Sequence, residues 1–360
     1  MNYFIKELKD AEGIQKTAGV KAREDADYIF QSCGLQELTV VSTVRESEDG
    51  KIFKRLLSHK VINTCWKKAL CNLKKGDTIF VQFPCIENSI LLANTFRELL
   101  KRGIEIVLLI HDLELLRLAK RTDVTLAKKL RLQIEENSML RLATKVIVHN
   151  DYMKQTLVER GINEEKIISL EIFDYIIKDF SVERLRKNEC KDEKSIIVAG
   201  NLRKDKATYV YHLPEQSHFK LYGVGYEADE KTNIDYMGAF SPDDLIYEMD
   251  GSFGLVWDGE KADTCTGVYG EYLKINNPHK TSLYLAAEIP VIIWKKAALA
   301  DFVKKNNCGI VVDSLYDIKE VTSNMTPEEY DLVKMGARRI GEKLRSGYYL
   351  KSAIKQCLEK

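Results

Sequence analysis

Short hydrophobic runs alternate with longer amphipathic segments along the first half of the chain. The short runs are rich in Val, Ile, Leu and Phe, and they predict β-strands at residues 38–42, 78–82, 104–110 and 145–149. The longer segments have the periodicity of α-helices, at residues 53–72, 87–102 and 126–143. Strands that alternate with helices in this way are typical of a parallel sheet with helices on both faces.

The second half repeats this alternation. Its short runs predict strands at residues 195–199, 219–222, 252–256, 290–294 and 309–312, with helices between and after them. We therefore expect an α/β protein with two Rossmann-like, doubly wound domains that face a central cleft. The boundary is expected in the charged residues 179–194, which could equally form a surface helix.

The predicted domains are residues 1–180 and 181–345, and residues 346–360 are expected to form a C-terminal helix that packs on the first domain. The length of 360 residues agrees with about two domains. Basic residues (55) and acidic residues (54) nearly balance, which argues against a nucleic-acid partner and favours a small ligand for any phosphate site.

The chain has neither the apolar core of a signal peptide near its start nor an apolar run of about 18 to 20 residues that could span a bilayer. Its eight cysteines are scattered, without the spacing of a zinc site. We expect reduced thiols in a cytoplasmic protein that is soluble or at most peripheral to a membrane.

Ligands of open α/β sheets bind beyond the carboxyl ends of the strands, so we expect the ligand-binding residues in the loops that follow the strands. At residues 276–287, Asn277 as N-cap and Pro278 as first residue predict a helix start. The N–H groups of His279, Lys280 and Thr281 would then attract a phosphate or diphosphate, aided by the lysine charge. The alternative is an ordinary capped helix whose lysine is solvated.

A second basic loop follows the first strand of the second half. Gly200 permits a tight turn, and Arg203, Lys204 and Lys206 supply cations, although a solvated surface loop would look the same. Gly223 and Gly225 after the next strand would let a flat base lie against the backbone. No Gly-x-Gly-x-x-Gly pattern follows the first predicted strand of either half, which argues against a nicotinamide enzyme.

The first half offers two candidate positions. Gly19 and Lys21 suit a close approach to a polar ligand, or else a capped turn. His111, Asp112 and Glu114 follow a strand, where one could be a general base and Asp112 could instead cap a helix. Neither a Gly-x-Ser-x-Gly elbow nor a Walker loop is present, so hydrolase and P-loop kinase functions are disfavoured.

These motifs resemble those of bacterial glycosyltransferases of the B fold (GT-B). Within that group, the chain is most similar to the subfamily that contains the glucosyltransferase of streptococcal serine-rich adhesins and the β-1,6-galactofuranosyltransferases. The resemblance rests on residues 18–22, 110–117, 148–150, 199–202, 265–273, 277–280 and 285–292.

The resemblance implies a UDP-sugar bound mainly to the second domain, with the first domain on the acceptor side. Arg203 and Lys280 would hold the diphosphate, with Lys206 in the place of a family lysine and Asn201 where the family has arginine. Gly223 and Tyr236 would contact the nucleotide. The family's Asn-Ala-Gly loop is here Thr17, Ala18 and Gly19. The two glutamates of broader relatives are replaced by Ile275 and Leu283.

The implied activity is inverting, metal-independent transfer of a glucosyl or galactofuranosyl group from the UDP-sugar to a protein-linked or lipid-linked glycan, without a cofactor. Asp112 is the first candidate for the base, followed by Glu114 and His111. A homo-oligomer is expected, and the basic residues 101–131 could contact anionic lipid. The alternatives are a sugar-nucleotide epimerase of the same fold and an inactive partner subunit of a transferase.

Overall fold

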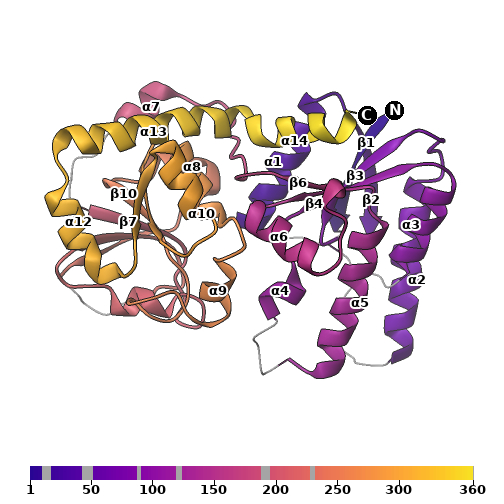
Figure 1. The fold of residues 1–360 in the computed structure, drawn as a ribbon, viewed down its shortest axis with the longest axis horizontal. Helices are drawn as coiled ribbons and strands as arrows, with labels where there is room; N and C mark the ends of the chain where they lie inside the picture. Colours follow the sequence, from indigo (N-terminus) through magenta and orange to yellow (C-terminus); the bar gives the residue numbers. More distant parts are fainter. Residues whose placement is uncertain are drawn as a thin grey trace. The chain divides into compact units, whose positions relative to one another are not determined.

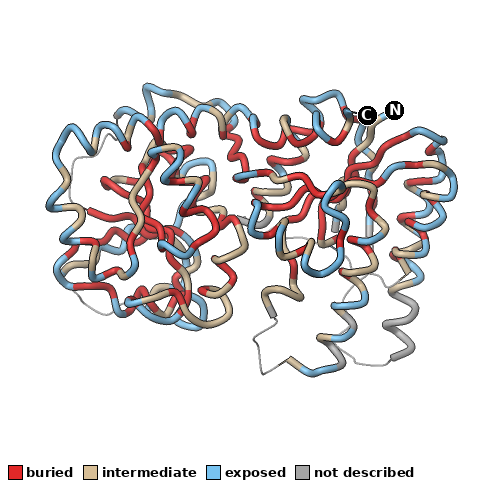
Figure 2. Tube along the Cα trace, in the orientation of Figure 1, coloured by how far each residue is buried: buried red, intermediate tan, exposed pale blue. Residues whose placement is uncertain are grey.

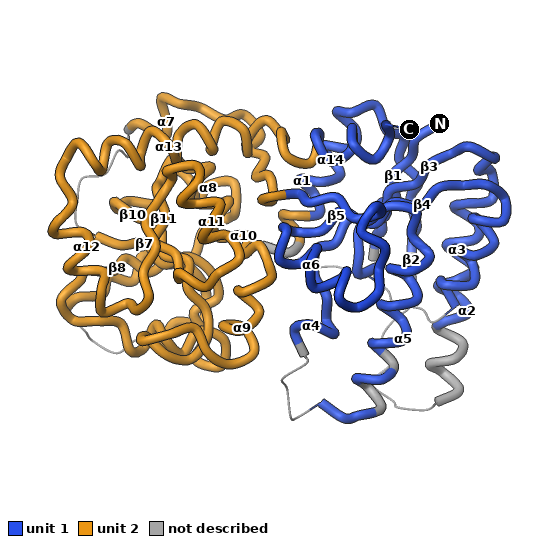
Figure 3. The backbone as a smooth tube through the Cα atoms, in the orientation of Figure 1, with its two compact units in different colours: residues 1–15, 23–170, 351–360 blue, residues 16–22, 171–350 orange. Residues whose placement is uncertain are grey.

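The computed structural model describes residues 1–9, 18–42, 52–86, 91–118, 124–187, 195–227 and 232–359. The chain divides into two compact units (Figure 3). Unit 1 contains residues 1–15, 23–170 and 351–360, and unit 2 contains residues 16–22 and 171–350. Each unit is built on one six-stranded sheet whose strands pair only in parallel within the described chain. The prediction of two doubly wound α/β domains is therefore confirmed.

The sheet of unit 1 has the strand order β2-β1-β3-β4-β5-β6 (Figure 1). Its strands are β1 (Asn2–Lys9), β2 (Gln36–Ser42), β3 (Thr78–Phe83), β4 (Glu105–Ile110), β5 (Lys145–Val148) and β6 (Ile167–Ser169). Its helices are α1 (Ala18–Ser32), α2 (Ile52–Ala69), α3 (Leu92–Lys101), α4 (Glu114–Leu118), α5 (Leu126–Leu142) and α6 (Asp151–Glu159). The helix α14 (Tyr348–Leu358) enters unit 1 at residue 351.

Strand β1 was missed by the sequence analysis, although it lies between β2 and β3. It pairs with β3 only through Asn2, Tyr3 and Phe4, while its register with β2 continues to Lys9. Its second half is therefore an edge, and its Lys and Glu residues hide the strand pattern.

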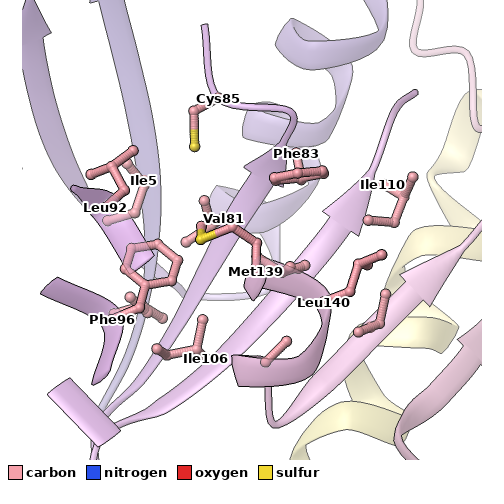
Figure 4. Packing of buried hydrophobic residues seen from close by; sticks show 14 of the residues in the cluster. Ile5, Val81, Phe83, Cys85, Leu92, Phe96, Ile106, Ile110, Met139 and Leu140 are labelled. Carbon is pink, nitrogen blue, oxygen red and sulfur yellow. The ribbon is translucent and has the colours of Figure 1, made fainter. Parts of the chain in front are cut away.

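The two faces of this sheet bury different side chains because neighbours along a strand point in opposite directions. On one face, Phe30 of α1 packs with Phe4 of β1 and with Phe80 of β3, with ring centroids 5.5 Å apart in each pair. On the other face, Ile5 and Val81 belong to a buried cluster that α2, α3 and α5 complete (Figure 4). The central strands β3, β4 and β5 are buried over nearly all of their length (Figure 2).

The sheet of unit 2 has the order β12-β11-β10-β7-β8-β9, the Rossmann order, which reverses direction between β7 and β10. Its strands are β7 (Ser195–Asn201), β8 (His218–Val224), β9 (Ile234–Gly238), β10 (Phe253–Val256), β11 (Val291–Trp294) and β12 (Gly309–Val312). Its helices are α7 (Val182–Lys187), α8 (Pro242–Glu248), α9 (Gly267–Tyr272), α10 (His279–Ala286), α11 (Ala300–Asn306), α12 (Ile318–Asn324) and α13 (Pro327–Ser346). The half-exposed edge strand β9 was not predicted, because it lacks an apolar run.

The compact units change at residues 170/171 and 350/351, whereas the predicted boundaries are 180/181 and 345/346. The segment after residue 170 is tied to unit 2 by its backbone and by one carboxylate. The Tyr175 N–H donates to the Leu344 carbonyl at 3.2 Å, and the buried Asp174 carboxylate accepts from the N–H groups of Tyr349 and Leu350 at 3.2 and 2.7 Å.

We expect Phe96→Ala to destabilise unit 1 by about 3–5 kcal/mol, because the side chain is fully buried and its ring lies 5.8 Å from that of Trp66. Urea unfolding followed by tryptophan fluorescence measures this loss. Val61→Ala is the control, since Val61 is 42% exposed on α2, and it should change the free energy of unfolding by less than about 0.5 kcal/mol. Equal effects of the two substitutions would contradict the packing described here.

Candidate active site

Helix α10 begins at the sequence motif that was singled out as a phosphate site. Pro278, with φ −66° and ψ 126°, is the N-cap residue, so the prediction that Asn277 caps the helix is wrong. Asn277 is instead buried, and its side-chain amide donates to the Glu171 carbonyl at 3.1 Å. Pro278 has no side-chain acceptor, so no side chain of the N-cap residue caps the N–H groups of the first turn. These groups form the positive end of the helix dipole.

Lys280 lies in the first turn of α10 and reaches the loop that follows β10. Its Nζ donates to the Trp257 carbonyl at 2.8 Å and to Asp258 Oδ1 at 2.9 Å, and the lysine side chain is 18% exposed. Burial lowers the pKa of Lys280, but Asp258 and other nearby groups raise it more, so the net shift is upward and the lysine stays charged.

Asp258 was missed by the sequence analysis, although a signal for it exists. It stands two residues after β10, at the carboxyl end of a strand beside the point where the strand order reverses. Ligands of open α/β sheets bind at such strand ends, so the position of Asp258 marks it as a candidate residue.

Four buried polar atoms around α9 and α10 have no hydrogen-bond partner in the described structure. They are Thr266 Oγ1, Asn276 Oδ1, His279 Nε2 and Thr281 Oγ1. Burial, and secondly the charge of Lys21, lower the pKa of His279 to about 3, so its imidazole is neutral. Buried polar atoms without partners are costly, and several of them at one helix start are typical of a site for a polar ligand.

The segment that contains Gly19 and Lys21 belongs to unit 2 and lies near His279. Gly19 stands in the first turn of α1. The Lys21 ammonium donates to the Ile176 carbonyl, lies 3.2 Å from an Asp243 carboxylate oxygen and sits 5.0 Å from the centroid of the Tyr175 ring. That ring is 5.2 Å from the His279 ring. The structure thus places two motifs near each other that the sequence analysis assigned to different domains.

The loops after β7 and β8 approach each other through glycine. A Cβ atom on Gly223, whose φ is +148°, would lie 1.7 Å from the Gly200 carbonyl oxygen. Tyr236 is 48% exposed on β9, and its hydroxyl donates to the Gly223 carbonyl at 2.8 Å. The Tyr226 ring lies 5.5 Å from the rings of both Tyr211 and Tyr236, which makes an aromatic row at this end of the sheet.

The predicted cations of the β7 loop are exposed. Asn201 Oδ1 accepts from the Arg203 N–H at 3.1 Å, and the Arg203 guanidinium makes two contacts with Asp205, at 2.9 and 2.6 Å. Asp205 raises the pKa of Arg203. The Lys206 ammonium lies 5.6 Å from the centre of the Tyr269 ring on α9. Strand β7, which precedes this loop, is hydrogen-bonded to α10: the Ala199 N–H of β7 donates to the Tyr284 hydroxyl of α10 at 2.7 Å.

The other candidates lie in unit 1, after β4. Arg117 holds both predicted carboxylates: its NH1 lies 2.9 Å from Asp112 Oδ2, and its NH2 contacts Glu114 Oε1. Asp112 Oδ1 also accepts from the Leu113 N–H at 3.0 Å. Burial raises the pKa of the neighbouring Glu136 to about 7, and its carboxyl accepts from the Leu115 N–H at 3.1 Å.

The basic region predicted to touch lipid includes the start of α5. Leu126, Leu130 and Ile134 lie along one face of this helix and are 83%, 54% and 59% exposed. Among the helices of the described chain, none is both long enough and apolar enough to cross a bilayer. Thr17 and residues 119–123, which follow α4, lie outside the described residues.

Comparison with known proteins identifies the family. The family model "Glucosyltransferase 3-like, N-terminal domain" matches residues 2–172, and "Glucosyltransferase 3-like, C-terminal domain" matches residues 196–357. Beta-1,6-galactofuranosyltransferase WbbI of Escherichia coli (strain K12) is 34% identical over 363 residues, covering 99% of this chain and 98% of that protein. Glucosyltransferase 3 of Streptococcus gordonii is 27% identical over 212 residues, covering 58% of this chain and 60% of that protein.

Solved structures show the same fold. HepE of Anabaena in complex with UDP gives a TM-score of 0.60 at 12% identity and covers 99% of each chain. WaaG, a glycosyltransferase involved in lipopolysaccharide biosynthesis, gives a TM-score of 0.56 at 12% identity and covers 100% of each chain. The resemblance inferred from the motifs is thereby confirmed. The chain belongs to the glucosyltransferase 3-like family and is a glycosyltransferase of the B fold.

Proposed function

We propose that the protein transfers a glucosyl or galactofuranosyl group from a UDP-sugar to a hydroxyl group of a glycan, with inversion and without a divalent metal ion. The names of the relatives specify galactofuranosyl and glucosyl transfer, and the HepE structure contains UDP. The observation that carries the proposal is the first turn of α10, where Lys280 stays charged and His279 and Thr281 hold buried atoms without partners.

This turn suits a departing diphosphate. Breaking the bond between the anomeric carbon and the phosphate oxygen adds negative charge to UDP, and a helix N-terminus with a fixed cation stabilises that charge. Lys280 is held in place by Asp258, so little reorganisation is needed when the charge develops. Arg203 and Lys206 would add cations from the β7 loop. An exposed ion pair such as Arg203–Asp205 contributes little to stability, so the arginine could leave the aspartate for a phosphate group.

Other residues of unit 2 suit the nucleoside and the sugar. Tyr236 and Gly223 would border the uridine, because the tyrosine ring is exposed and its hydroxyl is fixed on the glycine carbonyl. Asn201 would orient the β7 loop through its bond to the Arg203 N–H. Asn277 and Gly19 would shape the sugar side of the site, since Asn277 adjoins the start of α10 and Gly19 stands in the segment near His279.

The acceptor would be a glycan on a protein or a lipid. The exposed apolar row on α5 supports a membrane contact and therefore a lipid-linked acceptor. A homo-oligomer stays a prediction from the resemblance.

UDP is expected to raise the melting temperature of the protein, because a ligand that binds only the folded state adds about 2.7 kcal/mol at one hundred times its Kd. Differential scanning fluorimetry measures this shift, with AMP as the control nucleotide. An equal shift with AMP, or none with UDP, would refute a uridine-nucleotide site.

We expect Lys280→Ala to lower kcat/KM for the UDP-sugar about 10- to 150-fold, because a charge-assisted hydrogen bond contributes about 1.5–3 kcal/mol. Steady-state kinetics of UDP release measure the change. The matched control is Lys295→Ala, which removes a lysine that also follows a strand and pairs with a carboxylate, Asp313 at 2.8 Å. Lys280→Ala leaves the Asp258 carboxylate without its lysine partner and could therefore lower stability, so the melting temperature is measured as well. The double variant Asp258→Ala/Lys280→Ala should regain the lost stability but not the lost activity.

Asp112→Asn tests the first candidate for the base. If the carboxylate takes the acceptor proton, turnover should fall at least tenfold while the affinity for UDP is unchanged, since general bases contribute about 10²–10⁴-fold. Calorimetry with UDP and kinetics with donor and acceptor give the two quantities. A turnover within twofold of the unsubstituted protein would remove Asp112 from the proposed mechanism and leave it as a partner of Arg117.

A further inference from the structure

Three polar side chains of unit 1 form a hydrogen-bonded row at the carboxyl ends of β3 and β4. The Gln82 amide nitrogen donates to Asp27 Oδ1 at 2.6 Å, and Gln82 Oε1 lies 2.6 Å from His111 Nε2. Gln82 is only 4% exposed, whereas Asp27 and His111 are half-buried. A glutamine within the buried strand β3 is costly unless both ends of its amide are bonded, as they are in this row.

The row determines which nitrogen of His111 carries the proton. The Arg23 backbone carbonyl, 3.3 Å from the amide nitrogen, can only accept, so Gln82 turns its NH₂ group toward Arg23 and Asp27 and its carbonyl oxygen toward His111. An amide oxygen cannot donate, and therefore His111 Nε2–H is the donor in that contact. In the neutral imidazole the lone pair then belongs to Nδ1, the tautomer of a base that works through Nδ1.

The backbone of His111 is held as well. Its N–H donates to the Phe83 carbonyl at 2.7 Å. The buried side chain of His149, at the end of the next strand, hydrogen-bonds the backbone of Ile110 and His111. Burial lowers the pKa of His149 to about 4, so it supports His111 without adding a charge.

Charged groups surround the row from several elements. Burial raises the pKa of Asp27 to about 7, Lys6 of β1 and Arg23 of α1 lower it, and Glu37 of β2 raises it. The Gln82 amide nitrogen also lies 3.3 Å from the Arg23 carbonyl. Beyond His111, Asp112 and Glu114 contact the Arg117 guanidinium. An acceptor hydroxyl would therefore compete with Arg117 for either carboxylate, whereas the Gln82 contact places the lone pair of the neutral His111 ring on Nδ1.

We infer that His111 is the general base of the transfer and that Gln82 and Asp27 are positioning residues that fix its tautomer; this inference rests on the proposed function. His111 Nδ1 takes the proton of the acceptor hydroxyl as the hydroxyl oxygen bonds to the anomeric carbon. The bond from that carbon to the phosphate oxygen breaks, and its electron pair leaves with UDP. The proton then passes from the imidazolium to bulk water. With water as acceptor, the same step hydrolyses the donor.

Hydrolysis of UDP-glucose and UDP-galactofuranose tests the role of His111 without a known acceptor. His111→Gln should lower kcat for UDP release about 10²–10⁴-fold and leave the KM for the donor within twofold. The control is His212→Gln, at an exposed histidine of unit 2. If the unsubstituted protein hydrolyses the donor and folded His111→Gln keeps more than a third of kcat, the inference is overturned and the proposed function stands. If the unsubstituted protein neither binds UDP nor releases it from the donor, both the role of His111 and the proposed function are refuted.

The positioning role has a spectroscopic test that does not depend on turnover. In protein labelled with ¹⁵N-histidine, NMR should show the Nε2–H tautomer for His111, and Gln82→Met should abolish that preference and lower kcat about 10- to 100-fold. Asp27→Asn should have a smaller effect in the same direction, because its amide can face Gln82 either way. Gln133→Met, at an exposed glutamine of α5, is the control. An Nδ1–H tautomer in the unsubstituted protein, or unchanged kcat in Gln82→Met, overturns the positioning role.

Discussion

The ion pair between Lys280 and Asp258 fixes the place where helix α10 meets the sheet of unit 2. The lysine is largely shielded from water and its ammonium also donates to the Trp257 carbonyl, so the start of the helix is bound to the exit of β10. At the same time the Tyr284 hydroxyl accepts from the backbone of β7. Since β7 and β10 are the strands between which the order reverses, α10 stands over the position where open α/β sheets bind their ligands. The chemistry assigned to unit 2 depends on this constraint.

The two units concentrate different chemistry at their strand ends. Unit 2 combines a helix dipole, held and exposed cations, and buried polar atoms, which together favour a leaving group that gains negative charge. Unit 1 has a histidine whose ring and backbone are both bonded, next to two carboxylates that share one arginine. Stabilising a leaving group and removing a proton from a nucleophile are the two tasks that a transfer to a hydroxyl group requires.

Much of the fold followed from the sequence because buried parallel strands are continuous apolar runs. The runs at β3, β4 and β11 are buried on both faces, and each was predicted within two residues of its observed ends. Strands β1 and β9 were not predicted because both form exposed edges over part of their length, and β6 was not predicted because it is only three residues long. The start of α10 was predicted from Asn277 and Pro278, although its N-cap residue is Pro278 and not Asn277.

The contacts that build the sites were less accessible to sequence analysis. Gln82 and Asp27 are 55 positions apart, and Lys280 and Asp258 are 22 apart, so no local pattern joins them. Polar residues at strand exits can be found from sequence, as His111 and Asp112 were, but their partners depend on the order of strands in the sheet. Lys21 is the clearest case, since it lies in unit 2 although its sequence neighbours after residue 22 lie in unit 1.

The exposed pair of Arg203 and Asp205 sets a carboxylate of the protein itself in competition with any anion that would bind the arginine. The aspartate engages the guanidinium through two contacts, which is also how a phosphate group would engage it. An anion that binds the guanidinium must therefore displace Asp205, and Asp205 can bind the arginine again each time the anion dissociates. Under the proposed function, this carboxylate would weaken the retention of UDP as much as the capture of the UDP-sugar, and it would keep the loop from binding phosphate indiscriminately.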